Sequence, residues 1–416
     1  MRLAAAIVLI GGLVFLAHLF AVVFSRTRIP DVLWLLLIGV ALGPVSHLLT
    51  PAAFGVVGPA FVVITLVLIL FESGLSLQYK RLRRALPGTI ALSSVSFVAE
   101  ALVMGAATWA ATPLGAWRAF LLGVILAGNS PTVIVPLAKG LGLGTKTRDI
   151  LFLESAFGDV LSIVLALALL DFHFNGWSHW AGTGLQFVLG FGGAVVIGVL
   201  GGLVWSVLLR ITRALENAMF TTAAFVFMLY GCAELLHANG AIAALAFGVV
   251  LGNVERTPMV QEALPAEGLN HAEKLFLGEL VFLLKTFFFV YIGLSIEFNQ
   301  LRWLLFGGVL TLLLVAARIP AVRVTLRHHV GERDSAMAAC LVPKGLAAAV
   351  LASLLVERNV AGAEALQSVI YAVIFFGVVL TSVLVFIVNL PAGGRAMGWL
   401  LNGTPDPVPT SEPASK

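Results

Sequence analysis

The sequence predicts an all-α polytopic membrane protein, with about thirteen transmembrane helices, inverted repeats and two crossing discontinuous helices. Composition is the first of three observations behind this prediction. Hydrophobic residues make up 60% of the 416 residues, and charged residues make up only 11%. Soluble domains carry about 25% charged residues, so this chain has too few charges to cover a folded surface in water. The composition excludes a soluble globular enzyme, a disordered chain and a nucleic-acid-binding module.

The second observation is a series of long apolar segments. A transmembrane helix needs about 20 mostly apolar residues, and the mean hydropathy of +1.04 reflects how much of the chain meets that condition. The expected spans cover residues 4–24, 31–49, 57–77, 88–111, 117–138, 149–171, 183–209, 217–236, 239–253, 275–296, 303–325, 335–356 and 366–390. We expect one transmembrane unit over 1–390, followed by a short disordered tail over 391–416.

The distribution of basic residues predicts the orientation. With the N-terminus outside, 18 of the 25 Lys and Arg residues lie in inside loops or the tail, 4 lie outside and 3 lie within spans. This bias satisfies the positive-inside rule, which an even number of spans would break. We therefore expect a multi-pass protein of the plasma membrane, embedded in lipid, with its N-terminus outside and its C-terminus in the cytoplasm.

The third observation is an internal repeat. Residues 74–83 and residues 293–302 are identical at five of ten positions, at an offset of 219 residues. The first segment ends a span on the inside and the second ends a span on the outside, so the repeats are inverted. Inverted repeats are typical of secondary transporters, whose binding site lies near the middle of the membrane. The alternative is a chance similarity between two amphipathic helix ends.

A helix break is expected in the fifth span, at the sequence Gly-Asn-Ser-Pro-Thr over 128–132. Pro131 removes a backbone donor and clashes with the preceding turn, and the neighbouring glycine and asparagine weaken the helix further. A broken helix would direct its freed carbonyl groups and half-helix ends toward a cavity. Asn129 and Ser130 then become candidates for ion or proton binding. The alternative is a simple proline kink between packed helices.

The sixth span carries two carboxylates, Glu154 and Asp159. Ionisable residues inside a membrane are functional candidates because burying a charge there is costly. Asp159 shares a helix face with Ser155 and suits an exchangeable site, where a carboxylate holds either a proton or a monovalent cation. Glu154 points elsewhere and is expected to pair with a fixed cation. The alternative for Asp159 is a structural hydrogen-bonded network.

Two cations in later spans are the expected partners. Arg318 stays protonated, so it suits a permanent pair with Glu154; the alternative is that it extends to the inner membrane surface. Lys344 lies between Pro343 and Gly345, which mark a second expected helix break, 212 residues after Pro131. Lys344 would compensate the carbonyl ends of the half-helices or titrate itself.

The other membrane charges are weaker candidates. They are Glu72, Glu100, Glu234, Glu279 and Lys285. Solvation near the membrane surface is the simpler account of Glu72, Glu234 and Glu279, and the sequence names no partner for Lys285. The chain has no Walker-type loop, CxxC pair, HExxH or Gly-x-Ser-x-Gly motif. We therefore expect no cofactor and no enzymatic activity.

Taken together, these segments resemble the monovalent cation/proton antiporter superfamily, in its sodium/hydrogen exchanger branch. The resemblance covers residues 4–390. The matching segments are Phe-Glu-Ser-Gly-Leu at 71–75, Asn-Ser-Pro-Thr at 129–132, Glu154-Ser155 with Asp159, Phe-Phe-Val-Tyr-Ile-Gly-Leu at 288–294, Arg318, and Pro-Lys-Gly at 343–345. Each motif is weak alone, but together they are specific in this order and spacing.

The resemblance implies an antiporter fold with thirteen spans and a homodimer. It implies a moving core domain, mainly 88–171 and 303–390, and a dimerisation domain made of the remaining helices. It implies that a cation, Na⁺ or K⁺, competes with a proton for Asp159. Thr132 and Ser155 are implied cation ligands, and Glu154 with Arg318 is the implied structural pair.

Three departures from the family pattern bear on the ion preference. Gly158 stands where the exchanger branch usually has Asn, Ser130 where Asp is common, and Lys344 where Arg is common. A single exchangeable carboxylate favours one cation per proton and electroneutral exchange. The oxygen ligands suit Na⁺ or K⁺, and family frequency places Na⁺ first. The rival hypotheses are an ion channel and a non-transporting sensor or scaffold on the same fold.

Overall fold

The structure is a computed structural model that describes residues 3–27, 31–50, 57–77, 79–175, 180–213, 218–236, 238–256, 266–296, 298–326 and 329–389. Within these ranges the chain forms helices joined by short connections, and no β-strand occurs. The predicted all-α membrane fold is confirmed. The predicted tail over 391–416 lies outside the described residues.

Each of the thirteen expected spans contains one helix or two half-helices. The α-helices are α1 Leu3–Thr27, α2 Asp31–Val40, α3 Val57–Ser76, α4 Tyr79–Ala111, α5 Ala116–Ala127, α6 Pro131–Gly140, α7 Thr145–Asn175, α8 Trp180–Thr212, α9 Thr221–Leu235, α10 Gly240–Asn253, α12 His271–Leu294, α13 Leu301–Thr325, α14 Glu332–Cys340, α15 Leu346–Glu357 and α16 Ala363–Asn389. A π-helical turn, η1 Ala41–Val45, continues α2 past Val40. Short 3₁₀ turns, η4 Ala218–Phe220, η5 Val254–Arg256 and η6 Phe298–Gln300, lie next to α9, α10 and α13.

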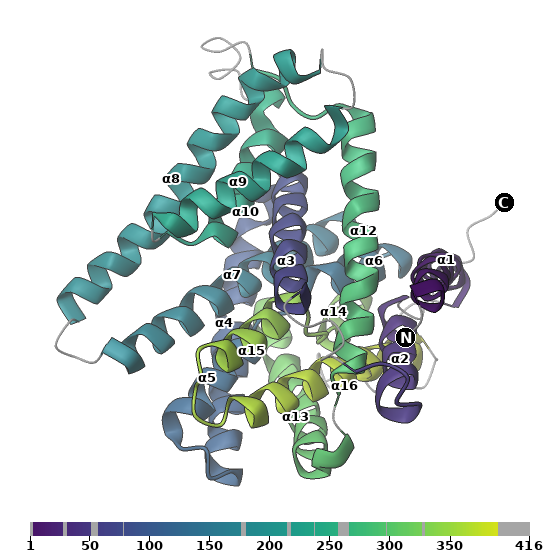
Figure 1. Ribbon diagram of the computed structural model, residues 1–416. Helices are drawn as coiled ribbons and strands as arrows, with labels where there is room; N and C mark the ends of the chain where they lie inside the picture. The colour runs from purple at the N-terminus through teal and green to yellow at the C-terminus, as the bar shows by residue number, and fades with distance from the viewer. Residues whose placement is uncertain are drawn as a thin grey trace. The chain divides into compact units, whose positions relative to one another are not determined.

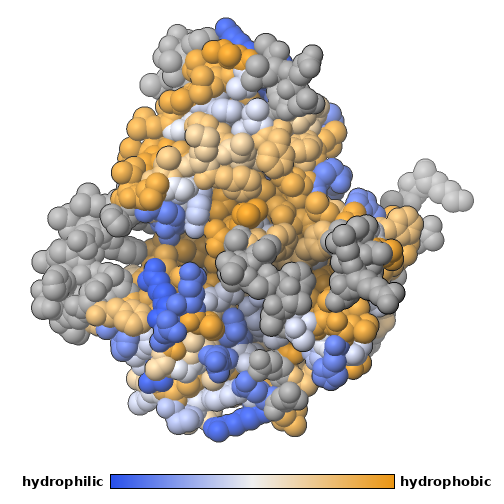
Figure 2. Space-filling model, in the orientation of Figure 1, coloured by the Kyte–Doolittle hydropathy of each residue, from blue (hydrophilic) through white to orange (hydrophobic). Residues whose placement is uncertain are grey.

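The helix lengths and surface suit a bilayer. Among the described residues, six helices are long and apolar enough to cross a membrane by length and composition. On α8 the side chains of Val196, Leu200 and Val204 are exposed at four-residue spacing, so one face presents aliphatic groups outward. Figure 2 shows hydrophobic residues gathered over this part of the surface. Outward aliphatic side chains are stable in contact with lipid and costly in water.

The chain divides into two compact units. Unit 1 comprises Met1–Ala53, Ala85–Ala166 and Phe289–Lys416, and unit 2 comprises Phe54–Arg84 and Leu167–Phe288. Both broken helices, α5–α6 and α14–α15, belong to unit 1. In unit 2, α10 packs against α3, α8 and α9 (Figure 1). The assignment of a moving core to 88–171 and 303–390 stays a prediction.

Glycine brings α3 and α10 into direct backbone contact in unit 2. A Cβ atom at Gly248 would collide with the carbonyl oxygen of Phe71, and one at Gly74 would collide with the carbonyl oxygen of Leu245. A Cβ at Gly252 would likewise collide with Leu75. Small residues let membrane helices approach this closely, which strengthens van der Waals packing where no hydrophobic effect separates helix from lipid.

The same contact recurs in unit 1, between α2 and the end of α12. A Cβ at Gly39 would collide with the carbonyl oxygen of Val290, and one at Gly293 would collide with that of Leu36. Val290 and Gly293 stand 219 residues after Phe71 and Gly74, which is the offset of the sequence repeat. Each copy of the repeat therefore forms the same type of glycine-mediated helix pair. This shared contact argues against a chance similarity between the two segments.

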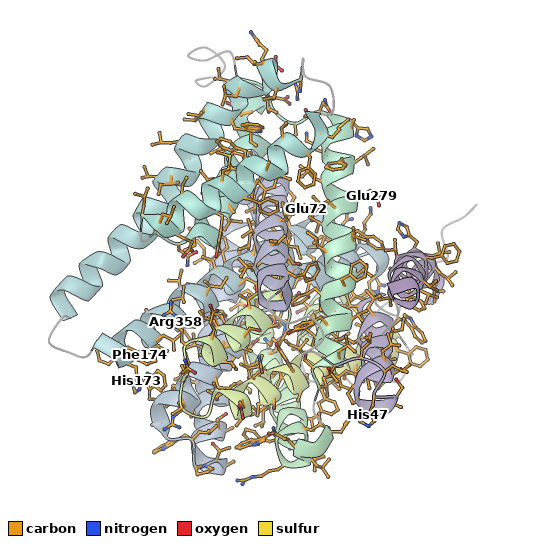
Figure 3. All side chains as sticks on the ribbon, viewed as in Figure 1. His47, Glu72, His173, Phe174, Glu279 and Arg358 are labelled. Atoms are coloured by element: carbon orange, nitrogen blue, oxygen red, sulfur yellow. The ribbon has the colours of Figure 1, made fainter. Side chains whose placement is uncertain are left out.

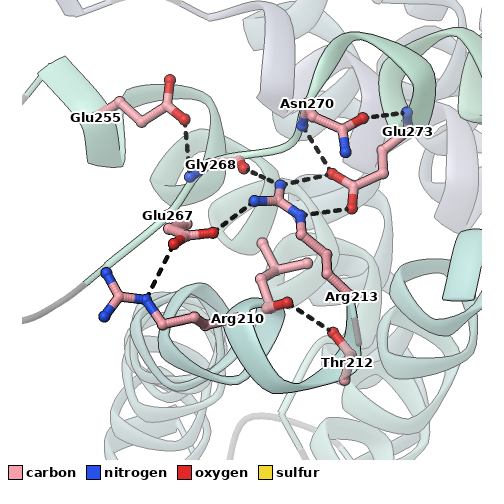
Figure 4. Close-up of polar contacts among 9 residues, drawn as sticks. Arg210, Thr212, Arg213, Glu255, Glu267, Gly268, Asn270 and Glu273 are labelled. Carbon is pink, nitrogen blue, oxygen red and sulfur yellow. Dashed lines mark hydrogen bonds and ion pairs between the residues drawn. The ribbon is translucent and has the colours of Figure 1, made fainter. Parts of the chain in front are cut away.

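A group of ion pairs holds the end of α8 to the segment before α12 in unit 2 (Figure 4). Arg213 donates to Glu273 at 2.8 and 3.0 Å and to the carbonyl oxygen of Gly268 at 2.6 Å, and it forms an ion pair with Glu267. Arg210 adds a 3.0 Å bond to Glu267. The hydrogen bond with Glu273 raises the pKa of Arg213, which therefore stays charged at any working pH. These bonds fix the connection that leads into α12.

The glycine contact predicts opposite effects of alanine at two positions. At Gly248 the added methyl group has no room against Phe71, so Gly248→Ala should lower the free energy of unfolding by about 1–3 kcal/mol. At Gly231, inside α9, no atom lies within 4 Å of the new Cβ. Gly231→Ala should therefore raise the free energy of unfolding slightly, since alanine favours helix over glycine. Thermal unfolding in detergent measures both, and equal melting temperatures would contradict this account of the contact.

Candidate functional site

The first helix break lies between α5 and α6. Gly128 and Ser130 have extended backbones, with ψ angles of 143° and 113°, and α6 begins at Pro131. Proline suits the first position of a helix, where its missing N–H has no partner to lose. The carbonyl oxygen of Ser130 accepts from the N–H groups of Val133 and Ile134. The predicted break is confirmed, and the alternative of a simple kink in a continuous helix is wrong.

The second break lies between α14 and α15, over residues 341–345. The N–H of Ser130 donates to the carbonyl oxygen of Pro343 at 2.8 Å, so the two breaks meet directly. A Cβ at Gly345 would collide with the side chain of Ser130, which explains why glycine is needed there. The hydroxyl of Thr381 on α16 accepts from the N–H of Val342 at 3.3 Å. Backbone groups released by the breaks thus bond to one another and to a neighbouring helix, as a membrane interior requires.

Arg318 of α13 forms the first of two buried ion pairs. Its guanidinium group donates to both carboxylate oxygens of Glu154 on α7, at 2.7 and 2.9 Å. Its Nε donates to the carbonyl oxygen of Ala338 at 2.9 Å, in the last turn of α14. Arg318 is fully buried, so the alternative in which it extends to the membrane surface is wrong. The cation also faces the partial negative charge at the C-terminal end of a half-helix.

Lys344 forms the second buried ion pair, with Glu100 of α4. Its ammonium nitrogen lies 2.6 Å from Glu100 Oε2 and 2.8 Å from Asn129 Oδ1. Asn129 in turn donates from Nδ2 to Glu154 Oε1 at 3.1 Å. One amide thus bridges the two ion pairs, and Glu100 Oε1 also lies 3.7 Å from Arg318 Nη1. We call Glu100, Asn129, Glu154, Arg318 and Lys344 the charge network. Its two carboxylates and two cations cancel in formal charge.

Asp159 adds one more carboxylate to this region of unit 1. It lies on α7, and its exposed fraction is 8%. No hydrogen bond or ion pair is formed by its side chain among the described residues, although it interacts electrostatically with Lys344. Both cations of the charge network already have carboxylate partners. Among the described residues, therefore, no group neutralises the Asp159 carboxylate by direct contact.

Two serines share the helix face of Asp159. Ser155 lies one turn before it and Ser162 lies one turn after it, and both are buried. Ser155 donates to the carbonyl oxygen of Phe152 at 2.9 Å, which leaves its oxygen able to accept a cation. The Ser162 hydroxyl has no hydrogen-bond partner within the described part of the chain. This face presents three oxygen-bearing side chains in succession.

Gly158 places this face of α7 against the first break. A Cβ at Gly158 would lie 3.3 Å from the Cα of Gly128 and 3.5 Å from the N of Asn129. A Cβ at Gly128 would lie 2.7 Å from the hydroxyl oxygen of Ser162. The two glycines let α7 approach the extended segment directly. An asparagine at 158, the residue that the exchanger branch usually has there, would need the neighbouring atoms to move by a few tenths of an ångström.

Sequence reasoning placed some residues differently from the structure. Asn129, expected among the ion ligands, has both ends of its amide occupied within the charge network. Thr132 lies in the first turn of α6, but its side chain lies outside the described residues. Ser130 contributes its backbone to the contact between the breaks.

Two residues of the site were missed from sequence. Glu100 was placed among the weaker charges, yet it is fully buried and binds Lys344. A lone carboxylate in the middle of an apolar span was the available signal. Ser162 was not singled out, although its three-residue spacing from Asp159 already placed both on one face.

The other membrane charges belong to unit 2, where Figure 3 labels Glu72 on α3 and Glu279 on α12. Lys285, for which the sequence named no partner, interacts electrostatically with Glu72. Glu234 accepts from the N–H of Gly240 at 2.8 Å, so it caps the start of α10. Glu72, Lys285 and Glu234 thus have their partners within unit 2.

Comparison with known proteins identifies relatives along most of the chain. The Na(+)/H(+) antiporter NhaH of Halobacillus aidingensis is 25% identical over 303 residues, which cover 70% of this chain and 74% of that protein. Na(+)/H(+) antiporter 1 of Methanocaldococcus jannaschii is 23% identical over 331 residues, which cover 75% of this chain and 74% of that protein. Sodium/hydrogen exchanger 7 of Arabidopsis thaliana is 26% identical over 286 residues, but the match spans only 24% of that longer protein.

A solved structure shares the fold. The sodium proton antiporter MjNhaP1 of Methanocaldococcus jannaschii, determined at pH 8, superposes with a TM-score of 0.72 at 20% identity, covering 92% of this chain and all of that one. The family model described as sodium/hydrogen exchanger, transmembrane, matches residues 12–390, which include both helix breaks, the charge network and Asp159. On these grounds the chain belongs to the sodium/hydrogen exchanger family of membrane transporters.

Proposed function

We propose that this protein exchanges sodium ions for protons across the membrane, with both ions competing for Asp159. The observation that carries the proposal is the distribution of charge partners. The two buried cations each have a carboxylate in contact, whereas Asp159 has none among the described residues. A carboxylate in that position is stabilised by a proton or by a bound cation, and each excludes the other.

The neutral charge network supports one-for-one, electroneutral exchange. Arg318 with Glu154, and Lys344 with Glu100, cancel in pairs. Asp159 then carries one negative charge, and either one proton or one sodium ion neutralises it. The loaded site has the same net charge in both directions of transport, so the membrane potential does no work on the cycle.

The oxygen atoms around Asp159 suit a small hard cation. Sodium prefers several oxygen ligands at short distance, as other hard cations do. We assign Ser155 and Ser162 from α7, together with Ser130 and Thr132 from the first break, as ligands beside Asp159. Potassium could use the same set at longer distances, and relatives named as Na(+)/H(+) antiporters favour sodium.

The remaining features of the proposal follow from the fold. The charge network and Asp159 belong to unit 1, and we propose that this unit contains the part that alternates between the two sides. We further propose a homodimer in the plasma membrane, in contact with lipid, with its N-terminus outside and its C-terminus in the cytoplasm. The basic loops predicted on the inside support this orientation.

The first prediction from the proposed exchange concerns Asp159. In liposomes with a pH dye inside, adding sodium against a proton gradient should move protons through the wild-type protein and not through Asp159→Asn. The substitution keeps the size of the side chain but removes its exchangeable charge. Glu357→Gln, at an exposed position, is the matched control and should retain exchange. Equal exchange by wild type and Asp159→Asn would show that transport does not depend on Asp159, which would contradict the proposal. A sodium current without proton movement would indicate a channel.

The second prediction concerns pH. Where Asp159 is mostly protonated, lowering the external pH by one unit should raise the apparent KM for sodium about tenfold, because the proton excludes the cation. The maximal rate at saturating sodium should change much less. A KM that is independent of pH, measured over several units in the same liposomes, would contradict competition at one carboxylate.

The third prediction concerns the charge network. Glu100→Gln leaves the buried ammonium group of Lys344 without its counter-charge and should lower the free energy of unfolding by about 3–5 kcal/mol. Lys344→Met should also destabilise the protein, because Glu100 then keeps only the more distant Arg318, at 3.7 Å, as a nearby cation. The double variant Glu100→Gln, Lys344→Met removes both charges and should cost less than the sum of the two single variants. Additive losses in melting temperature would contradict the pairing.

A further inference from the structure

A row of buried oxygen atoms runs along α4 toward the charge network. It consists of the hydroxyl groups of Thr89, Ser93 and Ser96 and the Oε1 atom of Glu100. All four residues are at least nine-tenths buried. None of these atoms has a hydrogen-bond partner among the described residues.

The four oxygens lie on one face of the helix. At 100° per residue, positions 89, 93, 96 and 100 fall within an arc of about 60°. Neighbouring members are about 4.5 to 6 Å apart along the axis, and the row is about 16 Å long. That length is roughly half the hydrocarbon thickness of a bilayer. The row therefore leads from the start of the apolar part of α4 to its middle.

Several other buried hydroxyl groups donate to a carbonyl oxygen of their own helix, whereas Thr108, Ser162 and Ser335 are isolated exceptions among the described residues. Thr311 donates to the carbonyl oxygen of Gly307 at 2.8 Å, Thr325 to that of Ala321 at 2.7 Å and Ser206 to that of Leu203 at 2.7 Å. The hydroxyls of Thr89, Ser93 and Ser96 do not make this bond. Because an unsatisfied buried polar group is costly, three consecutive exceptions on one face point to a ligand that accepts and donates hydrogen bonds.

We propose that this row binds a file of water molecules, and that the file carries protons between the Gly88 end of α4 and the region of the charge network. One or two waters can bridge neighbouring oxygens of such a row through hydrogen bonds of ordinary length. Each hydroxyl both donates and accepts, so the file can pass a proton by successive exchange of hydrogen bonds, with no net change in any group. The proposal deepens the proposed antiport and depends on it for its physiological role.

The two ends of the file connect to suitable groups. At one end, Glu100 Oε1 is the oxygen that Lys344 does not bind, and Lys344 also reaches Asn129 at the first helix break. At the other end, the Cβ position of Gly88 lies 3.6 Å from Cδ2 of His329, whose side chain is exposed. The file thus joins the charge network to the Gly88 end of α4.

The first experiment tests for water without measuring transport. In a Cys232→Ala, Cys340→Ala background, Ser96→Cys and Thr311→Cys are each exposed to Ag⁺, a thiol-reactive ion of nearly the size of water. The remaining thiols are then counted with a maleimide after denaturation. The thiol at 96 should react and the thiol at 311, in a dry contact, should be protected. Protection of both thiols would overturn the proposal.

The second experiment tests proton transfer. The triple variant Thr89→Val, Ser93→Ala, Ser96→Ala keeps the shapes and removes the hydroxyls. Its proton flux in liposomes should fall by at least about tenfold, with an unchanged apparent KM for sodium. Ser206→Ala with Thr311→Val is the control, because it removes self-satisfied hydroxyls, and it should leave flux unchanged. The single variant Ser96→Ala repeats the test if the triple variant does not fold.

The melting temperature of the triple variant distinguishes a row of hydroxyls that binds water from one that packs without water. Replacing unsatisfied hydroxyls in a dry contact should raise the melting temperature, whereas replacing hydroxyls that bind water should not. A triple variant that melts higher and transports at the wild-type rate would overturn the proposal. If wild type and Asp159→Asn are equally inactive, the proposed antiport fails, and the Ag⁺ experiment still decides whether the row holds water.

Discussion

The interior of this protein depends on the neutralisation of four charges buried within the membrane. An isolated charge there is too costly to keep, and breaking one partner from a buried pair is strongly destabilising. Arg318 and Lys344 come from two different parts of unit 1, and each meets a carboxylate from α7 or α4. The amide of Asn129 joins the two pairs. The positions of α4, α7, α13 and both helix breaks are therefore tied together by one set of contacts.

The helix breaks make these contacts possible. A continuous helix has no free backbone groups in its middle, whereas the non-helical residues at 128–130 and 341–345 bond to one another through Ser130 and Pro343. The break also places Asn129 and Lys344 within hydrogen-bond distance. With the network neutral, the proposed exchange leaves the Asp159 carboxylate to be neutralised by a sodium ion or a proton. The α4 row then offers protons a separate route to the same region.

The glycine contacts perform the complementary task of holding apolar helices together in lipid. The α3–α10 pair in unit 2 and the α2–α12 pair in unit 1 use the same device, backbone against backbone at Gly74 with Gly248 and at Gly293 with Gly39. Lipid tails solvate leucine as well as protein does, so close approach is the main source of attraction available. The internal repeat is thus visible both in the residues and in the contact that those residues make.

The sequence by itself determined the all-α membrane fold, both helix breaks and the pairing of Glu154 with Arg318 that the family resemblance implied. These features depend on local composition, on proline and glycine, and on charges too few to be satisfied in more than a few ways. Only the tertiary structure decided that Glu100 is the partner of Lys344, that Asn129 bridges the ion pairs, and that Thr89, Ser93 and Ser96 have no hydrogen-bond partner among the described residues. Such contacts join residues up to 244 positions apart, and helix periodicity gives the face of a side chain but not the helix that it meets.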